Sequence, residues 1–280
     1  MWTTPAIDPD RNAIYVATGN PWPDTNGKRR PGDNLFTDCI VALDASNGHM
    51  KWYFQQTAHD TADLDAASPP VLFETTDGAG HKVPAVGEVG KTGFFYVLNR
   101  DTGEMVRRSK NLASVSAATR RSQRWEGGST WSPVSYDPHL GYVVVSAAQH
   151  LKMERGSARA SRNESLWNSG WSSGYGTVSA VDVTTGKVAW QDEFDQGLVG
   201  GSVSTAGGVT FVGEGNGYFD ALETKSGQRL WRFQTGAGVN AAPITFEVNG
   251  TQYVAVASGG NQQFGTSLGD AVFVFNLARR

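Results

Sequence analysis

The chain has 280 residues, among them 34 glycines, 9 tryptophans and a single cysteine, Cys39. The glycine share, about 12%, exceeds the ~7% of average proteins, while 39% hydrophobic residues are enough to bury a core and exclude wholesale disorder. The net charge of −3 offers no basic excess for a nucleic-acid backbone, and the lone cysteine excludes an intrachain disulfide scaffold. No apolar run is long enough to span a membrane, and the first residues lack the pattern of a signal peptide.

Short apolar runs rich in β-branched and aromatic residues predict strands along the whole chain. Each run is bounded by Gly, Pro, Asn or Asp, and helical periodicity is almost absent, so the sequence predicts an all-β fold. Tight turns are expected at Gly215-Asn216-Gly217 and Asn249-Gly250, because glycine adopts a positive φ at little cost. The most strand-like runs, in chain order, are 13–17, 94–98, 142–145, 253–257 and 272–275.

One local motif occurs four times. A strand ends in Asp, Asn or Glu, a short turn follows, then a glycine, and in three copies a tryptophan stands four residues after that glycine. The last two glycines, Gly186 and Gly227, are 41 residues apart, which matches the ~40–45 residues of a four-stranded propeller blade. The longer steps from Gly48 to Gly103 and on to Gly186 require insertions. We count about five blades, with strand pairs expected at 3–19, 131–147, 200–213 and 241–259.

The motif has a structural explanation that needs no function. Its acidic or amide side chain accepts hydrogen bonds from turn amides, its glycine takes a positive φ, and its tryptophan covers the seam between neighbouring blades. The segments 104–126 and 149–176 are predicted to be loops, the first of them basic and solvated.

Six further segments outside the motif stand at 18–21, 31–37, 59–65, 90–98, 127–133 and 199–201. In their order and spacing they resemble the quinoprotein dehydrogenases. These are eight-bladed β-propellers that carry pyrroloquinoline quinone (PQQ) together with Ca²⁺ or a lanthanide ion. The resemblance runs from residue 2 to about residue 277, and it is specific because several different segments match.

The resemblance implies a role for individual residues. Asp63 would be the general base that takes the substrate's hydroxyl proton, and it would also lie at the metal with Asn20, a ligand through its side-chain oxygen. Lys91 would donate to the quinone oxygens, where a positive charge stabilises the reduced cofactor. Asp65, two residues after the base, resembles the extra ligand of the lanthanide-using members. Alternation would place Asp63 and Asp65 on one face only if the segment is extended.

Four further positions would contact the cofactor. Trp2 falls where the family places a tryptophan under the PQQ ring, and Trp131 where another touches its edge. Thr130 stands where the family has an asparagine and keeps a hydroxyl for one hydrogen bond. Val199, with Leu198, replaces aromatic residues of several members, which indicates a wider substrate cavity or lost chemistry.

Each assignment has a structural alternative. Asn20 between Gly and Pro is also a typical turn former, and Lys91 before Thr-Gly a typical turn lysine. Asp63 and Asp65 could belong to a solvated acidic loop, and Trp2 could cap a blade seam. Their joint occurrence in the family's order favours the functional interpretation.

Residues 1–280 are predicted to form a partial propeller with about five of the eight blades. The N-terminal blades and the signal peptide are expected to be missing from this sequence. The predicted reaction is PQQ-dependent oxidation of an alcohol or sugar hydroxyl in the periplasm, with an unidentified cytochrome or quinone as electron acceptor and no nucleic-acid partner. The fragment alone is expected to bind PQQ poorly. Two alternatives stay open: a non-enzymatic propeller scaffold in outer-membrane protein assembly, and a truncated product without activity.

Overall fold

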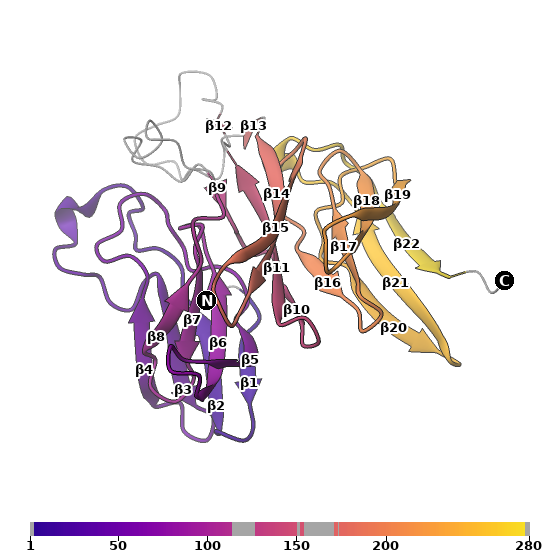
Figure 1. The fold of residues 1–280 in the computed structure, drawn as a ribbon. Helices are drawn as coiled ribbons and strands as arrows, with labels where there is room; N and C mark the ends of the chain where they lie inside the picture. The colour runs from indigo at the N-terminus through magenta and orange to yellow at the C-terminus, as the bar shows by residue number, and fades with distance from the viewer. Residues whose placement is uncertain (1–2, 114–126, 150–151, 154–170, 173, 278–280) are drawn as a thin grey trace, which may run out of the picture.

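The computed structural model describes residues 3–113, 127–149, 152–153, 171–172 and 174–277. Within them the expected all-β fold is confirmed, because the helical elements are short 3₁₀ turns such as η1 (Gly27–Arg29) and η4 (Gln262–Phe264). In Figure 1 the indigo and purple sheets of β1–β8 overlap at one side, and the sheets that follow in the chain lead across to the yellow C-terminal strands.

The sheets follow one another as blades, and each is built mainly from consecutive strands. Sheet 1 has the order β1-β2-β3-β4 and sheet 2 the order β5-β6-β7-β8. Sheet 1 comprises β1 (Ala6–Asp8), β2 (Ala13–Ala17), β3 (Cys39–Asp44) and β4 (Met50–Gln55). Sheet 2 comprises β5 (Val71–Thr76), β6 (Lys82–Val89), β7 (Phe95–Asn99) and β8 (Met105–Arg108).

Sheet 3 carries two small additions. The strand β9 (Gly127–Gly128) pairs with β11, and β12 (Lys152–Met153) pairs with β13 (Trp171–Ser172) as a separate ribbon. The main strands of sheet 3 are β10 (Ser135–Asp137), β11 (Tyr142–Gln149), β14 (Tyr175–Asp182) and β15 (Val188–Phe194).

Sheet 4 has four strands and sheet 5 has three. The predicted turns are confirmed, since Asn249 and Gly250 both have positive φ between the first two strands of sheet 5. Sheet 4 comprises β16 (Ser202–Ser204), β17 (Val209–Gly213), β18 (Tyr218–Glu223) and β19 (Arg229–Gln234). Sheet 5 comprises β20 (Ile244–Val248), β21 (Thr251–Ser258) and β22 (Ala271–Asn276).

Because neighbouring strands are antiparallel, the connections divide between two ends of the molecule. The turn end holds the short hairpins that join first to second and third to fourth strands. The other end, here called the site end, holds the loops from second to third strands and from one sheet to the next. The site end therefore collects the loops 18–38, 56–70, 90–94, 127–134 and 195–201.

The core lies between the sheets and follows the alternation of side chains along each strand. On β11, Val143 and Val145 pack toward sheet 2 while Val144 packs toward sheet 4. Between sheets 1 and 2, Tyr15 and Trp52 pack against Leu98. Between sheets 4 and 5, Phe219 packs with Val254 and Val256. Each sheet thus stabilises its sequence neighbours through buried apolar area.

A regular hydrogen bond crosses the seams at the turn end. The indole of Trp52, four residues after Gly48, donates to the carbonyl of Arg100, three residues before Gly103, with Nε1 2.9 Å from the oxygen. Trp190 makes the equivalent bond to Thr224, also at 2.9 Å. The predicted role of these tryptophans as seam covers is confirmed for sheets 1–2 and 3–4.

The seam between sheets 2 and 3 uses an arginine in the same place. Arg107 stands four residues after Gly103, and its Nη1 donates to the carbonyl of Val183 at 2.7 Å and to the hydroxyl of Thr75 at 2.9 Å. The prediction of a loop from residue 104 is therefore wrong over β8, where Arg107 occupies the position that tryptophan has in the other three copies of the motif. Residues 114–126 of that predicted loop lie outside the described residues, as do 150–151, 154–170 and 173 of the second one.

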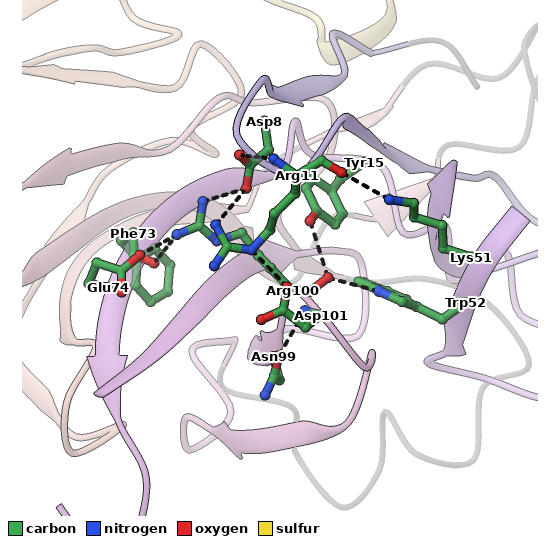
Figure 2. A network of polar contacts seen from close by, with 10 residues as sticks. All are labelled: Asp8, Arg11, Tyr15, Lys51, Trp52, Phe73, Glu74, Asn99, Arg100 and Asp101. Carbon is green, nitrogen blue, oxygen red and sulfur yellow. Dashed lines mark hydrogen bonds and ion pairs between the residues drawn. The ribbon is translucent and has the colours of Figure 1, made fainter. Parts of the chain in front are cut away.

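Figure 2 shows how polar groups reinforce the seam between sheets 1 and 2. The guanidinium of Arg100 bridges Asp8, with Nη1 2.7 Å from Oδ2, and Glu74. Its carbonyl accepts the Tyr15 hydroxyl at 3.1 Å besides the Trp52 indole. Arg100 and Asp8 are both nearly buried, so the ion pair between them, which joins sheet 2 to sheet 1, is less screened than a pair in open solvent, whereas the pair with the exposed Glu74 lies within sheet 2.

Candidate functional site

The first group of predicted site residues meets where loops of sheets 1 and 2 converge. Asn20 lies in the loop after β2, Asp63 and Asp65 in the loop between β4 and β5, and Lys91 in the loop after β6. All of these loops are at the site end. Direct contacts join the four residues, although up to 71 positions separate them in sequence.

Lys91 lies between the two aspartates. Its Nζ is 2.8 Å from Asp63 Oδ1 and 2.6 Å from Asp65 Oδ2, and the side chains are largely shielded from solvent. The backbone N–H of Lys91 also donates to the carbonyl of Asp65 at 3.0 Å. The ammonium thus holds both carboxylates in one place.

The acidic loop reaches this arrangement through a turn and not as an extended strand. Asp60 accepts hydrogen bonds from the amides of Ala62 at 2.7 Å and Leu64 at 2.8 Å, and Asp63 itself has φ +62. Asp63 and Asp65 both face Lys91 because of this turn, so the alternation expected for an extended segment is not what aligns them.

Asn20 is fixed to the acidic pair through its backbone. Its N–H donates to Asp65 Oδ1 at 2.7 Å, and its side-chain Nδ2 donates to Asp24 Oδ1 at 2.9 Å. These bonds use the donors of Asn20, which leaves Oδ1 as the side-chain atom that can face a cation.

Burial sets the electrostatics of this group. Burial raises the pKa of Asp63 above its usual range; the charge of Lys91 opposes this and the charge of Asp65 adds to it. Burial alone would lower the pKa of Lys91, but the two carboxylates outweigh it and raise that pKa. Lys91 therefore carries its charge firmly, while Asp63 is a carboxylate that holds a proton more readily than an exposed one.

The second group of predicted residues adjoins the first. Ser68, from the acidic loop, donates to the Thr130 carbonyl with its Oγ 2.9 Å away. Gly128 has φ +116, and a Cβ at this residue would lie 2.8 Å from the Lys91 carbonyl oxygen. Only glycine lets the loop that carries Thr130 and Trp131 approach the loop that carries Lys91 this closely.

Trp131 and Val199 share an apolar cluster at the site end. Val199 and Ala148 are buried, and Leu64, Trp131 and Phe264 pack against them. The rings of Trp131 and Phe264 meet edge to face with centroids 5.7 Å apart. Since Leu64 lies between Asp63 and Asp65 in sequence, this cluster borders the charged group.

The structure thus brings together seven of the eight predicted site residues in two adjoining groups: Asn20, Asp63, Asp65 and Lys91, and Thr130, Trp131 and Val199. Trp2 lies outside the described residues. The roles of all eight stay predictions.

Sequence reasoning missed several neighbours of the site. Phe264 stands in a loop with no motif, and its only local signal is Asn261, which caps η4. Glu88 and Asp38 are buried acids near the charged group, and nothing in their sequence surroundings marks them as buried.

The donor atoms fit a hard cation. The candidate ligands Asn20, Asp63 and Asp65 all offer oxygen, which Ca²⁺ and lanthanide ions prefer over nitrogen or sulfur. In the described part of the chain no cluster of three or more His, Cys, Asp or Glu side chains could hold a metal, so these residues would supply only part of a coordination sphere. The apolar cluster with Trp131 fits an aromatic cofactor beside the cation.

Comparison with known proteins places this arrangement in context. The family model described as PQQ, glucose/ethanol/alcohol dehydrogenase, beta-propeller domain, matches residues 1–112 and 169–254. The quinoprotein alcohol dehydrogenase PedH of Pseudomonas putida is 30% identical over 293 residues, which cover 92% of this chain and 49% of the relative. The quinohemoprotein alcohol dehydrogenase of Comamonas testosteroni is 31% identical and covers 95% of this chain and 43% of the relative.

Solved structures give the same result. The crystal structure of the Comamonas testosteroni quinohemoprotein alcohol dehydrogenase aligns with all of this chain and 49% of its own, with a TM-score of 0.80 and 28% identity. A europium-containing methanol dehydrogenase aligns with 93% of this chain and 51% of its own, with a TM-score of 0.75 and 25% identity. The chain spans about half the length of the relatives it matches. Among the described residues, no helix combines the length and apolarity needed to cross a membrane.

Proposed function

This chain belongs to the PQQ-dependent glucose/ethanol/alcohol dehydrogenase family of β-propellers, and on that basis we propose that it forms part of an enzyme that oxidises an alcohol hydroxyl. One observation carries the proposal. A buried lysine holds two aspartates at 2.8 and 2.6 Å, beside an asparagine bound to one of them and an apolar cluster that contains a tryptophan. A purely structural propeller needs no such arrangement.

The residues divide into three tasks. Asn20, Asp63 and Asp65 would hold the cation through oxygen atoms, and Thr130, Trp131 and Val199 would line the cofactor pocket. PQQ, when bound with its cation, supplies a two-electron acceptor. Lys91 would keep Asp63 and Asp65 in register and direct its positive charge toward the oxygens of the bound cofactor.

Asp63 would be the general base. Its carboxylate would accept the substrate's hydroxyl proton, and burial, by raising its pKa above the usual range, makes it a stronger base than an exposed aspartate. Lys91 limits that rise, so Asp63 can still lose its proton after each turnover. The neighbouring apolar side chains reduce the access of water, which strengthens these charge interactions.

The substrate class follows from the relatives and remains part of the proposal. Several proteins similar to this chain are named as alcohol dehydrogenases. One of them is a quinoprotein ethanol dehydrogenase of Pseudomonas putida that is 29% identical. We favour a small alcohol over a sugar for this reason. The periplasm as location and a cytochrome or quinone as electron acceptor are proposed for the intact protein.

A dye-linked assay tests the proposal. The intact protein, reconstituted with PQQ and either Ca²⁺ or La³⁺, should reduce an artificial acceptor when a primary alcohol is added. Asp63→Asn should lower kcat by roughly 10²–10⁴, the usual contribution of a general base. Asp33→Asn, which removes an exposed carboxylate from the loop that contains Asn20, is the matched control and should keep its activity. Lack of activity with every alcohol and sugar, or full activity of Asp63→Asn, would overturn it.

A further inference from the structure

Asp38 is a buried acid whose backbone joins two loops of the candidate site. It precedes β3, and its N–H donates at 3.1 Å to the carbonyl of Gly19, the residue before Asn20. Its own carbonyl accepts the N–H of Gln56 at 2.8 Å, where the acidic loop begins. The residue is 0% exposed, so its backbone is fixed between the two loops and its carboxylate has no access to solvent.

The carboxylate of Asp38 has no partner. Neither Oδ1 nor Oδ2 accepts a hydrogen bond within the described residues. The hydroxyl of the adjacent Thr37 has a single hydrogen, and it donates that hydrogen to the Asn34 carbonyl at 2.7 Å. A buried carboxylate in this state is unfavourable unless a positive charge or a proton compensates it.

The other acids of the region differ from Asp38 in this respect. Asp60 accepts two backbone amides, and Asp65 accepts the Asn20 amide and the ammonium of Lys91. Burial, followed by the negative charges of Asp60, Asp65 and Asp63, raises the pKa of Asp38 to about 8. Its charged neighbours therefore have the same sign, and Asp38 forms no ion pair in the part of the chain that the structure describes.

We propose that Asp38 is a positioning residue for the cation, a buried negative charge outside the coordination sphere that favours a trivalent ion over a divalent one. The proposal rests on the cation site of the proposed function. Asp38 does not join Asp63 and Asp65 as a third ligand, because the described residues contain no group of three such side chains able to hold a metal. It acts through its electric field, and the interaction of a fixed charge with an ion grows in proportion to the charge of that ion.

Cation binding to Asp38→Asn tests the proposal without any measurement of turnover. The intact protein, freed of metal, is titrated with Tb³⁺ by sensitised luminescence and with Ca²⁺ by calorimetry. The variant should bind Tb³⁺ roughly tenfold and Ca²⁺ roughly fivefold more weakly, as expected when both losses scale with ionic charge. Its thermal midpoint without metal should rise, because the substitution removes the cost of burying a carboxyl group that has no partner.

A merely structural role predicts the opposite pattern. If Asp38 serves only to hold the loop, Asp38→Asn lowers the midpoint without metal and leaves the ratio of Tb³⁺ to Ca²⁺ affinity unchanged, which would overturn the proposal. Asp33→Asn, exposed in the same loop, removes an equal charge and should leave both affinities within about twofold. Asp38→Ser is a second neutral variant if the amide prevents folding.

The outcomes also separate this proposal from the proposed function. Wild-type protein that binds neither ion would refute the cation site, and the role of Asp38 with it. Wild-type protein that binds Tb³⁺ and loses it in Asp63→Asn but not in Asp38→Asn would keep the proposed function and refute only the role of Asp38.

Discussion

Replacing Glu88 by glutamine is expected to flatten the dependence of stability on pH. Glu88 lies near the site end of β6 and is completely buried. One carboxyl oxygen accepts the side-chain amide of Gln56, and the other accepts the N–H of Ser68 at 3.2 Å. Burial raises the pKa of Glu88 from 4.5 to about 8, although both hydrogen bonds oppose the rise.

The size of the effect follows from proton linkage. Between pH ~5.5 and ~7.5 Glu88 keeps its proton in the folded protein and loses it on unfolding, so the unfolded state binds one proton fewer. The free energy of unfolding then falls by about 1.4 kcal/mol for each pH unit, about 2.7 kcal/mol over the interval. This stabilisation is complete below the unfolded pKa and is lost as the pH rises through about 8. Glutamine does not titrate, so the variant lacks this contribution.

Urea denaturation of the metal-free wild type and of Glu88→Gln, at three pH values between ~5.5 and ~7.5, measures how steeply the free energy of unfolding of each protein depends on pH. The free energy of unfolding of Glu88→Gln should fall less steeply with pH than that of the wild type. The difference should be about 1.4 kcal/mol per pH unit, which corresponds to one proton. Other acids contribute to both slopes and cancel in the difference. Glu247→Gln, on β20, removes an exposed carboxylate and serves as the control. Parallel slopes for wild type and Glu88→Gln would refute the reasoning.

Three further substitutions address the seams and the site. Trp190→Phe removes the indole donor to Thr224 and should lower the free energy of unfolding by about 1–2 kcal/mol in urea titrations; an unchanged midpoint would contradict the importance of this bond. Gly103→Ala places a methyl group 2.7 Å from the Trp52 ring at φ +76, and should lower the thermal midpoint by several degrees in a calorimetric scan. Lys91→Met removes the ammonium that pairs with Asp63 and Asp65. The thermal midpoint of the metal-free protein should therefore fall, and the increase of the midpoint on adding La³⁺ should exceed that of the wild type.

The fold could be predicted well because its signals are local. Three of the four motif copies combine a turn acid, a glycine and a tryptophan within about ten residues, and in two of these copies the tryptophan closes a seam as expected. β8 was missed because Arg107 fills the tryptophan position, and a run of basic residues is more typical of a solvated loop. A guanidinium can replace an indole here because both present an N–H to the carbonyl three residues before the next motif glycine.

The site was predicted only in part, because its contacts join distant positions. The pairing of Lys91 with Asp63 spans 28 residues and was not predicted, because the family resemblance assigned each residue a role at the cofactor but gave no contact between them. Asp38 and Glu88 could not be predicted, since a single acid within a loop or strand gives no sign of complete burial. Burial is a property of the assembled sheets.

The regular hydrogen bond at the turn end bears on how such a protein can evolve. Each of the first three seams between the described sheets is closed by a donor four residues after one motif glycine and an acceptor three residues before the next, so sheets 2 and 3 each carry both halves of a uniform joint. Loops at the opposite end make no part of this joint. Insertions and substitutions can therefore accumulate in the loops around the site without disturbing the contacts between sheets. Substrate or ion specificity can change in this way while the packing of the blades stays the same.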